Sequence, residues 1–512
     1  MPLDPLSPDL PVVLLSHRGP VSFGRDAAGR RTAERGAGGL VTALTGLAGH
    51  LHDAVWVCVA PSGEDAAVAQ EAGGTVVRVA LDGEPRLLAD GEDAPGRTVG
   101  LRLIEVPREI HDAFYGVIAN PLLWFLQHRL HDLPRTPSLG RAEHVAFEDG
   151  YVVANALAAD AVCEQVEKVG GQAGVLLHDY HFYLVPDLVR QRCPDALISH
   201  FVHIPWPGPD AWRVLPPDLR QRLLTGLLGA DVVAFHTRAD ARAFLLCAQE
   251  LLGLPVDLSA MTIQSAGRTV RVRAYPISID VPELEAIAHT DAADEHLVNL
   301  DHQLGDGALI LRVDRTDPSK NIVRGFQAYD LLLTEHPELH GRVLFLALLQ
   351  PSRQDVPEYA TYLTEIGAAA TAVNARHGTG DWQPVDLRFA HDMSLATAAY
   401  RRCDVLVVNA VADGMNLVAK EAVVLSERDM VLALSEATGA HDELGRFAVT
   451  LHPFDIAQQA DALFEALTMP AQLRRDRREH AALVVHHNDV RRWLTAQLSD
   501  LAELATRSRD GA

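Results

Sequence analysis

Short apolar runs alternate with longer amphipathic segments along most of this 512-residue chain. In the first half the apolar runs lie at residues 12–15, 55–60, 76–81, 99–106, 175–181, 198–207, 230–235 and 270–275. Runs of this length, rich in Val, Ile and Leu, are typical of strands that are buried on both faces of a sheet. Helical periodicity separates several of them, most clearly over 108–132 and 148–168. This order predicts an α/β architecture with parallel strands.

A polar, acidic and helix-like stretch at about 281–306 interrupts the alternation. The pattern then restarts, with apolar runs at 308–313, 342–349, 385–389, 404–411 and 430–435. We therefore predict two Rossmann-like domains, an N-terminal one over 1–282 and a C-terminal one over 283–490, with a cleft between them. Residues 491–512 are predicted to form a helix that packs back across the domain junction.

The composition narrows the class of protein. Hydrophobic residues make up 48% of the chain and charged residues 22%, as in ordinary soluble proteins. The formal net charge of −23 argues against a general nucleic-acid or anionic-membrane surface, so an anionic ligand would need a local cluster of Arg and Lys. The first residues lack a basic signal-peptide region, and no apolar run approaches the roughly 18 residues of a membrane span. We expect a cytoplasmic protein without a membrane or nucleic-acid partner.

The segment Asp413-Gly-Met-Asn-Leu-Val-Ala-Lys-Glu421 follows an apolar strand and opens a helix. Unpaired backbone N–H groups and the positive end of the helix dipole favour an anion at such a position. The carboxylates of Asp413 and Glu421 can accept hydrogen bonds from hydroxyl groups, and Glu421 would face back toward the loop from about two turns away. This combination indicates a sugar nucleotide. The structural alternative is that Asp413 caps the helix and Glu421 is solvated.

Four basic residues are candidates for phosphate binding. Arg315 and Lys320 lie between the end of a strand and the start of a helix, where they can neutralise a departing diphosphate. The alternative is a capped helix with Asp317 and Lys320 as a surface ion pair. Arg18 follows the first strand, and Arg353 lies in the second half. Arginine suits bidentate recognition of phosphate, and a cleft lined from both domains could use one of them for the phosphate of an acceptor. The alternative for each is a solvated surface arginine.

Histidines follow two neighbouring strands of the predicted sheet. His178 and His181 flank Asp179, and His203 comes after the next strand. One metal ion could hardly collect the first three, because neighbours on a strand point to opposite faces. Hydrogen bonding of Asp179 and His203 to a polyol is more economical than metal binding, and satisfied core or loop residues are the alternative. Five scattered cysteines without CxxC spacing favour buried free thiols over disulfides or a zinc site.

Ten short motifs, which include those described above, together resemble the motifs of one protein family. They lie at residues 16–18, 37–40, 115–124, 178–181, 203–207, 227–231, 275–279, 315–320, 351–353 and 413–421. From about residue 12 to 470 the chain resembles the trehalose-6-phosphate synthases, which are retaining glycosyltransferases. The resemblance implies a GT-B fold, with two facing Rossmann-like domains, parallel sheets and an interdomain cleft. It also implies transfer of glucose from UDP- or GDP-glucose to glucose 6-phosphate, giving α,α-trehalose 6-phosphate without a metal or another cofactor.

The resemblance further implies roles for matching positions. Those expected in catalysis are Arg315 and Lys320 on the donor diphosphate, His203 on the donor sugar, and Asp179. Donor binding is expected from Gly39, Asp413, Gly414, Met415, Asn416, Leu417 and Glu421. Acceptor binding is expected from Arg18, Tyr115, Trp124, Asp179 and Arg353.

Three positions depart from the family pattern: His17, Ser278 and Asn321 stand where Asn, Gly and Gly are usual. The stretch 316–321 also resembles the pseudo-glycosyltransferases, which join aminocyclitols through nitrogen. The loop with Gly38-Gly39, together with Met415, argues against membership in that branch. The alternatives that stay open are another acceptor on the same fold, such as a cyclitol phosphate or glycerol 3-phosphate, and a non-catalytic sugar-phosphate sensor. Small-molecule substrates are the expected partners, and a homo-oligomeric state is left open.

Overall fold

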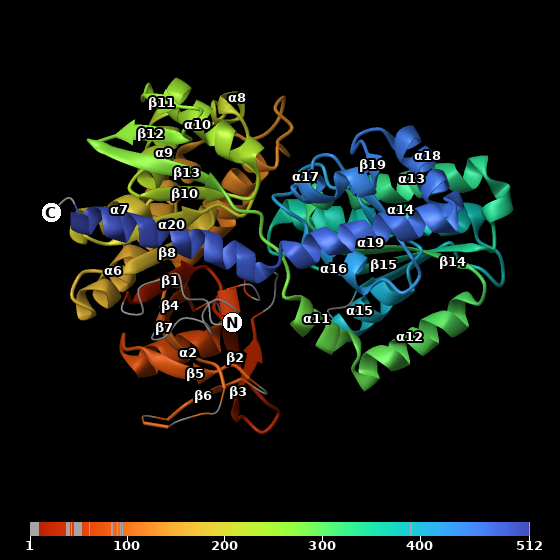
Figure 1. Cartoon of the computed structure of the whole chain (residues 1–512), viewed down its shortest axis with the longest axis horizontal. Coiled ribbons are helices and arrows are strands. Elements are labelled where there is room, and N and C mark those ends of the chain that lie inside the picture. The colour runs from red at the N-terminus through yellow and green to blue at the C-terminus, as the bar shows by residue number, and fades with distance from the viewer. Residues whose placement is uncertain are drawn as a thin grey trace. The chain divides into compact units, whose positions relative to one another are not determined.

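The computed structural model describes residues 10–36, 41, 44–45, 54–60, 62–82, 85–89, 91–92, 94, 96–389 and 392–510, with side chains up to residue 506. The chain divides into two compact units, which Figure 1 shows. Unit 1 comprises Met1–Pro276 with Val490–Ala512, and unit 2 comprises Ile277–Asp489. The first division lies a few residues before the boundary predicted at 282.

Unit 1 is built around an 11-stranded sheet in the order β11-β12-β13-β10-β9-β8-β1-β4-β7-β5-β6. The strands from β13 to β7 in this order are parallel. They are β1 (Val12–Ser16), β4 (Val55–Val59), β7 (Thr98–Ile104), β8 (Gly174–His178), β9 (Leu197–Phe201), β10 (Val232–Phe235) and β13 (Arg268–Ala274). Each coincides with a predicted apolar run, so the parallel core of this unit is confirmed.

The prediction of parallel pairing is wrong at the edges of this sheet. The edge strands β5 (Val77–Ala80), β6 (Arg86–Leu87), β11 (Val256–Asp257) and β12 (Thr262–Ser265) are antiparallel to their neighbours, and β2 (Val21–Arg25) and β3 (Arg31–Arg35) form a separate hairpin. The turns that join β2 to β3, β5 to β6, β11 to β12 and β12 to β13 are too short for a parallel crossover. Between β12 and β13, for example, Ala266 and Gly267 have φ values of 50° and 75°, as in a type I′ hairpin turn.

The helices of unit 1 are α2 (Gly63–Ala72), α3 (Arg108–Ala113), η1 (Phe114–Trp124), α4 (Phe125–Gln127), α5 (Arg141–Val145), η2 (Ala146–Val152), α6 (Val153–Lys168), η3 (Tyr180–Phe182), α7 (Val185–Arg192), α8 (Pro209–Trp212), α9 (Pro217–Leu227), α10 (Arg238–Leu252) and α20 (Val490–Asp510). The helix predicted over 108–132 ends earlier, at Gln127, and its middle is a π-helix that contains Pro121. Proline lacks the N–H that an α-helical hydrogen bond needs, so a wider turn fits there.

The C-terminal helix α20 lies along the sheet of unit 1 (Figure 1). The ring of Trp493 packs against Phe201 of β9 with centroids 5.5 Å apart. The carboxylate of Asp500 forms ion pairs with Arg271 and Arg273 of β13. The helix therefore closes the hydrophobic core of the unit in which the chain begins.

Unit 2 contains a six-stranded parallel sheet in the order β16-β15-β14-β17-β18-β19. Its strands are β14 (Ala308–Arg315), β15 (Val343–Gln350), β16 (Val385–Phe389), β17 (Val405–Val408), β18 (Val431–Ser435) and β19 (Val449–Leu451). The first five match predicted runs. The last was missed because a three-residue strand carries no period of its own.

The helices of unit 2 are α11 (Val281–Ala288), α12 (Asp291–Leu304), η4 (Pro318–Lys320), α13 (Ile322–Glu335), η5 (Pro337–Leu339), α14 (Pro357–His377), α15 (Met393–Arg402), α16 (Leu417–Leu425), α17 (Ala440–Leu444), η6 (Gly445–Phe447), α18 (Ile456–Thr468) and α19 (Ala471–His487). Buried Phe326 and Tyr329 of α13 pack on Phe345 of β15 in the core. The strand order reverses between β14 and β17, and a parallel sheet opens a crevice for ligands at such a point.

Candidate functional site

The strand-order reversal in unit 2 brings two predicted site segments together. Arg315 is the last residue of β14 and Lys320 lies in the loop that follows it, while Asp413 follows β17, the neighbouring strand. Both loops leave the carboxyl ends of their strands, because the two strands are parallel. Residues nearly a hundred positions apart in the chain therefore share one edge of the sheet.

Lys320 and Asp413 form a direct ion pair. The Nζ atom of Lys320 donates to Oδ2 of Asp413 over 2.6 Å and lies 3.7 Å from Oδ1 of Asp314. Burial by itself would lower the pKa of Lys320, but these two carboxylates outweigh it and hold the pKa above its ordinary value. Lys320 is therefore a cation at neutral pH. The Lys320 side chain is 15% exposed, so the ammonium is held in place by the two carboxylates without the residue being fully enclosed.

The buried side chain of Arg312 in β14 holds the loop that carries Lys320 in place. This arginine is fully buried and donates to the carboxylate of Asp314 and to the backbone carbonyl of Lys320, each over 3.0 Å. It also donates to the side chain of Asn409, which follows β17. The loops after β14 and β17 are thus tied to each other by a buried hydrogen-bond network.

Arg315 pairs with a different carboxylate. Its guanidinium lies 2.5 Å from Asp317, whose side chain is fully buried, while Arg315 itself is 45% exposed. Burial would raise the pKa of Asp317, but the charges of Arg315, Arg353 and Lys320 hold it below its ordinary value. The predicted alternative of a surface pair between Asp317 and Lys320 is wrong, because Asp317 is buried and pairs with Arg315. The arginine is thereby held by a buried anchor and keeps its outer donors for a ligand.

Arg353 also lies near this anchor. Its backbone has φ 48°, and its Nη1 donates to the hydroxyl of Tyr359 over 2.5 Å. The adjacent Ser352 amide donates to the hydroxyl of Thr316 over 3.1 Å, which joins the loops after β14 and β15. The structure therefore brings Arg353 together with Arg315, whereas its predicted companion Arg18 belongs to the other unit.

The loop 413–416 pairs with the loop after β18. The amide of Asp413 donates to the carbonyl of Ala437, and the amide of Gly439 donates to the carbonyl of Asp413, over 3.1 and 3.0 Å. The backbones approach so closely that a Cβ atom on Gly439 would lie 2.0 Å from the carbonyl oxygen of Gly414. Only glycine fits at position 439. This contact fixes the predicted donor-binding loop.

Helix α16 is capped by Asn416 and not by Asp413, so the structural alternative for Asp413 is wrong. Oδ1 of Asn416 accepts from the amide of Ala419, and its Nδ2 donates to Asp413, both over 3.1 Å. Asn416 adopts φ 82° to do so, and Met415 beside it is buried. Among the described residues, the amides of Met415 and Leu417 donate to no carbonyl outside the helix. These amides are free to meet an anion.

Glu421 lies within α16, more than one helical turn after the N-cap residue Asn416. Its Oε2 accepts a hydrogen bond from the hydroxyl of Tyr400 on α15 over 3.0 Å. Burial raises the pKa of Glu421, and the bond from Tyr400 offsets this only in part. The alternative of a solvated Glu421 is therefore wrong. A carboxylate held in one orientation suits recognition of hydroxyl groups.

In unit 1 the strand order reverses between β8 and β1, and predicted residues follow both strands. Asp179 follows β8 with an unusual φ of 76°, and its Oδ1 accepts from the amide of His203 over 3.3 Å. The rings of His178 and His203 form a hydrogen bond of 3.0 Å. Burial lowers the pKa of His178 to about 3 and that of His203 well below its usual range, so both rings are neutral at physiological pH.

Four aromatic rings stack beside Arg18. The rings of His17, Tyr115 and His181 pack against one another, with centroids 4.8 Å apart for His17–Tyr115, 4.5 Å for His17–His181 and 5.9 Å for Tyr115–His181, and Tyr115 also stacks on His111 at 5.2 Å. Arg18 is exposed directly after β1. The histidine that departs from the family pattern thus orients Tyr115, a predicted acceptor-binding residue.

Two predicted residues are placed less directly. Trp124 is 2% exposed, its ring lies on His128 with centroids 4.0 Å apart, and it is the last residue of η1, the helix that carries Tyr115. Gly39 lies outside the described residues. The roles of both residues stay predictions.

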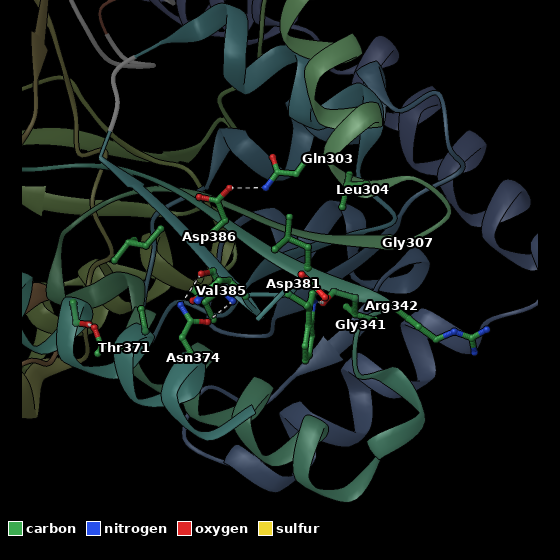
Figure 2. A pocket seen from close by; sticks show the side chains of 17 residues that line it. Gln303, Leu304, Gly307, Gly341, Arg342, Thr371, Asn374, Asp381, Val385 and Asp386 are labelled. Atoms are coloured by element: carbon green, nitrogen blue, oxygen red, sulfur yellow. Dashed lines mark hydrogen bonds between the residues drawn. The ribbon is translucent and has the colours of Figure 1, made fainter. Parts of the chain in front are cut away.

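A cavity of about 760 Å³ lies at the end of the unit 2 sheet opposite this candidate site, where β15 and β16 begin (Figure 2). It is lined by the segments that precede and begin β15 and β16, with Gln303 donating to Asp386 over 3.1 Å across its rim. Asn374 is bound on both sides to the backbone of Val385, and Arg342 points away from the cavity. None of the predicted site residues lines this cavity, and its polar groups bind mainly to each other.

The remaining predicted features concern metals, thiols and membranes. All five cysteines are buried free thiols, as predicted. Over the described ranges no group of three or more His, Cys, Asp or Glu side chains is arranged to hold a metal ion. Within those same ranges no helix has the length and apolar character to cross a membrane.

Several residues that build the site were missed from the sequence. Asp314 and Asp317 orient the two cations, and Gly439 fixes the donor loop. The alternation of acidic and basic residues over 314–320 is a signal for the first two. Gly439 and Tyr400 carry no comparable local signal, because their partners lie in distant loops and helices.

Comparison with known proteins adds a family. The sequence profile of glycosyltransferase family 20 matches residues 11–503. A bifunctional trehalose-6-phosphate synthase/phosphatase of Thermoproteus tenax is 32% identical over 406 residues, which cover 78% of this chain and 53% of that protein. The α,α-trehalose-phosphate synthase (UDP-forming) A of Dictyostelium discoideum is 28% identical over 485 residues, covering 94% of this chain and 61% of that protein. The chain therefore spans only part of the length of both relatives.

A solved structure is also similar. The crystal structure of an α,α-trehalose-phosphate synthase (UDP-forming) from Burkholderia xenovorans in complex with glucose-6-phosphate matches with a TM-score of 0.79 at 27% identity. The match covers 96% of this chain and 99% of that one. Such likenesses confirm the predicted α/β fold of the GT-B class.

Proposed function

Because the chain belongs to glycosyltransferase family 20, we propose that it is an α,α-trehalose-phosphate synthase that transfers glucose from UDP-glucose to glucose 6-phosphate with retention. The observation that carries this proposal is the ion pair of Lys320 with Asp413 at the strand-order reversal of unit 2, beside Arg315. It combines cations for a diphosphate with a carboxylate for sugar hydroxyls. The similar proteins support this donor and acceptor, since the Dictyostelium discoideum relative is named a UDP-forming enzyme and the Burkholderia xenovorans structure is a complex with glucose-6-phosphate.

In the proposed reaction the bond between C1 of glucose and the departing phosphate oxygen breaks. A bond from C1 to the acceptor hydroxyl forms on the same face, and the hydroxyl proton passes to the departing oxygen. Negative charge grows on the diphosphate as this happens. Lys320, held protonated by its carboxylate neighbours, and Arg315, held by Asp317, neutralise that charge without reorganising. These two cations take the place of a metal ion, so we expect turnover to continue in EDTA.

The donor is proposed to lie along the start of α16. Asp413 accepts hydrogen bonds from glucose hydroxyls, and the amides of Met415 and Leu417 meet its oxygens or the phosphates. Glu421, oriented by Tyr400, accepts from the ribose hydroxyls. Gly39, Gly414, Asn416 and His203 complete the proposed donor set.

The acceptor is proposed to be recognised by two kinds of groups. Arg18 and Arg353 bind the phosphate of glucose 6-phosphate, because a guanidinium matches a phosphate in a bidentate way. Tyr115 and Asp179 bind the sugar, and Trp124 supports them. The His17 stack holds the Tyr115 ring in place.

The test is nucleotide release with purified protein and glucose 6-phosphate, run in parallel with UDP-glucose and GDP-glucose. We expect UDP release and a stoichiometric disaccharide phosphate. Faster turnover with GDP-glucose would overturn the proposed base preference. Turnover with glycerol 3-phosphate or a cyclitol phosphate but not with glucose 6-phosphate would replace the acceptor. Binding of sugar phosphate by folded protein without any release of nucleotide would favour a sensor.

A further inference from the structure

One buried ion pair in unit 2 contacts both places where the chain passes between the two units. The chain enters unit 2 at Ile277 and leaves it after Asp489. The Nζ atom of Lys420 donates to the carbonyl of Ile277 over 2.8 Å and to the carboxylate of Glu443 over 2.5 Å. The other oxygen of Glu443 accepts from the side chain of Asn488 over 2.9 Å. Four residues from four distant parts of the sequence thus form one connected network.

The burial of this network makes it sensitive to change. The Lys420 side chain is 1% exposed and that of Glu443 is 12% exposed. Burial lowers the pKa of Lys420, while Glu443 opposes the shift. A buried charge that loses its partner carries a large desolvation penalty, so the contacts of Lys420 act together. The entering segment is equally enclosed, with Ile277 4% and Ser278 1% exposed.

Lys420 also occupies a particular place on α16. It directly precedes Glu421, and the same short helix begins at Asn416, which binds Asp413. A nine-residue helix moves as one body, because its backbone hydrogen bonds join every turn. Any displacement at Lys420 therefore reaches Glu421 and the loop in front of Asn416.

We propose that Lys420 is a positioning residue that fixes α16, and with it Glu421, to the two crossing segments at Ile277 and Asn488. Binding of a nucleotide at α16 and the conformation of the crossing segments are then coupled, and the coupling is reciprocal. The inference rests on the proposed donor role of α16. Its ligand is the nucleoside diphosphate part of the donor.

The test compares K420M, E443Q and the double variant K420M/E443Q with the native protein. The single change K420M leaves Glu443 buried without its cation, so it lowers the melting temperature. The double variant removes both charges and recovers most of the stability, but it still lacks the contact to the Ile277 carbonyl. We expect the KM of the double variant for UDP-glucose to be about tenfold higher than that of the native protein. Its kcat and its KM for glucose 6-phosphate should be nearly unchanged.

A matched control is R402M, because Arg402 is another buried cation of unit 2 whose ion pairs and hydrogen bonds run to Asp301, Asp404 and the Gly307 carbonyl, none of which lies on α16. It should lose stability without a selective change in the donor KM. A double variant K420M/E443Q with native stability and a native donor KM would overturn the proposal, as would an equal shift of the donor KM in R402M.

Hydrogen exchange separates this inference from the proposed function. With UDP as the probe, we expect slower exchange at residues 277–280 and 488–490 in the native protein and no such effect in K420M/E443Q. If the native protein neither binds UDP nor turns over, the proposed function fails. Faster exchange of 277–280 in the double variant without ligand would still support the positioning role, and unchanged exchange there would overturn it.

Discussion

The ammonium of Lys320 lies 2.6 Å from the carboxylate of Asp413, which follows 93 residues later in the chain. The two loops meet because β14 and β17 are neighbours in the sheet although β15 and β16 separate them in sequence. A cation for phosphate and an acceptor for hydroxyl groups thereby share one site. Asp314, 3.7 Å from the same ammonium, adds a second carboxylate that keeps Lys320 charged.

Replacing Arg315 should impair turnover strongly. In R315A the departing diphosphate loses a cation that acts as charge develops, so we expect kcat to fall by about 100- to 1000-fold. The fold should also lose about 1–3 kcal/mol of stability, because buried Asp317 loses its partner. Steady-state kinetics and thermal melting measure the two effects.

The double variant R315A/D317N is the control for that experiment. It no longer buries an unpaired carboxylate, so its melting temperature should recover while kcat stays low. Recovery of kcat together with stability would show that Arg315 acts only through the fold.

Donor binding should depend on the ionisation of Glu421. Burial raises the pKa of this carboxyl, so as the pH falls it gains a proton earlier than an exposed glutamate does. The protonated form accepts fewer hydrogen bonds from the ribose, so the KM for UDP-glucose should rise as the pH falls, and the rise should begin at a higher pH than the pKa of an exposed glutamate would give. The variant E421Q should have a high KM for UDP-glucose that does not change with pH in this way. A native-like rise in E421Q, or the loss of the rise in the exposed-site control E358Q, would contradict the assignment.

The close packing at Gly439 should matter for activity. In G439A the added Cβ atom meets the carbonyl of Gly414, so the loop that carries Asp413 must shift. We expect kcat/KM to fall by about 10- to 100-fold, since small displacements of positioned groups are costly. Gly367 of α14 provides a matched control, because a Cβ atom there meets nothing within 4 Å. G367A should keep native activity and stability, whereas equal losses in both variants would remove the special role of position 439.

The ring cluster at His17 should affect binding of the acceptor but not binding of the donor. H17A removes a ring that packs on both Tyr115 and His181, so the KM for glucose 6-phosphate should rise about three- to tenfold. The KM for UDP-glucose should stay within about twofold. H336A is the control, since it removes a stacked ring against Phe464 in unit 2. A larger change in the donor KM than in the acceptor KM of H17A would contradict the assignment.

Hydrophobic periodicity was sufficient to predict the strands of a sheet that is buried on both faces. Every strand of the parallel cores except β19 coincides with an apolar run, because continuous burial leaves a continuous signal. The edge strands β11 and β12 carry mixed side chains, and their antiparallel pairing follows from the short turns 258–261 and 266–267, which periodicity does not record.

The candidate site was predictable where its residues lie next to each other in the sequence. Arg315, Lys320 and the loop from Asp413 come directly after apolar strands, and their position at a strand end follows from the α/β pattern. The partner of each residue was not predictable. The pairing of Lys320 with Asp413 depends on strand order, which no local pattern fixes.

The most direct test of the proposed activity is identification of the product. Native protein is mixed with UDP-glucose labelled with ¹³C at C1 and with glucose 6-phosphate, and the product is followed by NMR. The account predicts a labelled 1,1-linked disaccharide phosphate with the α configuration kept at the labelled carbon, and its loss in folded K320M. An inverted configuration, an unchanged rate in K320M, or no product from folded native protein that binds both substrates would contradict it.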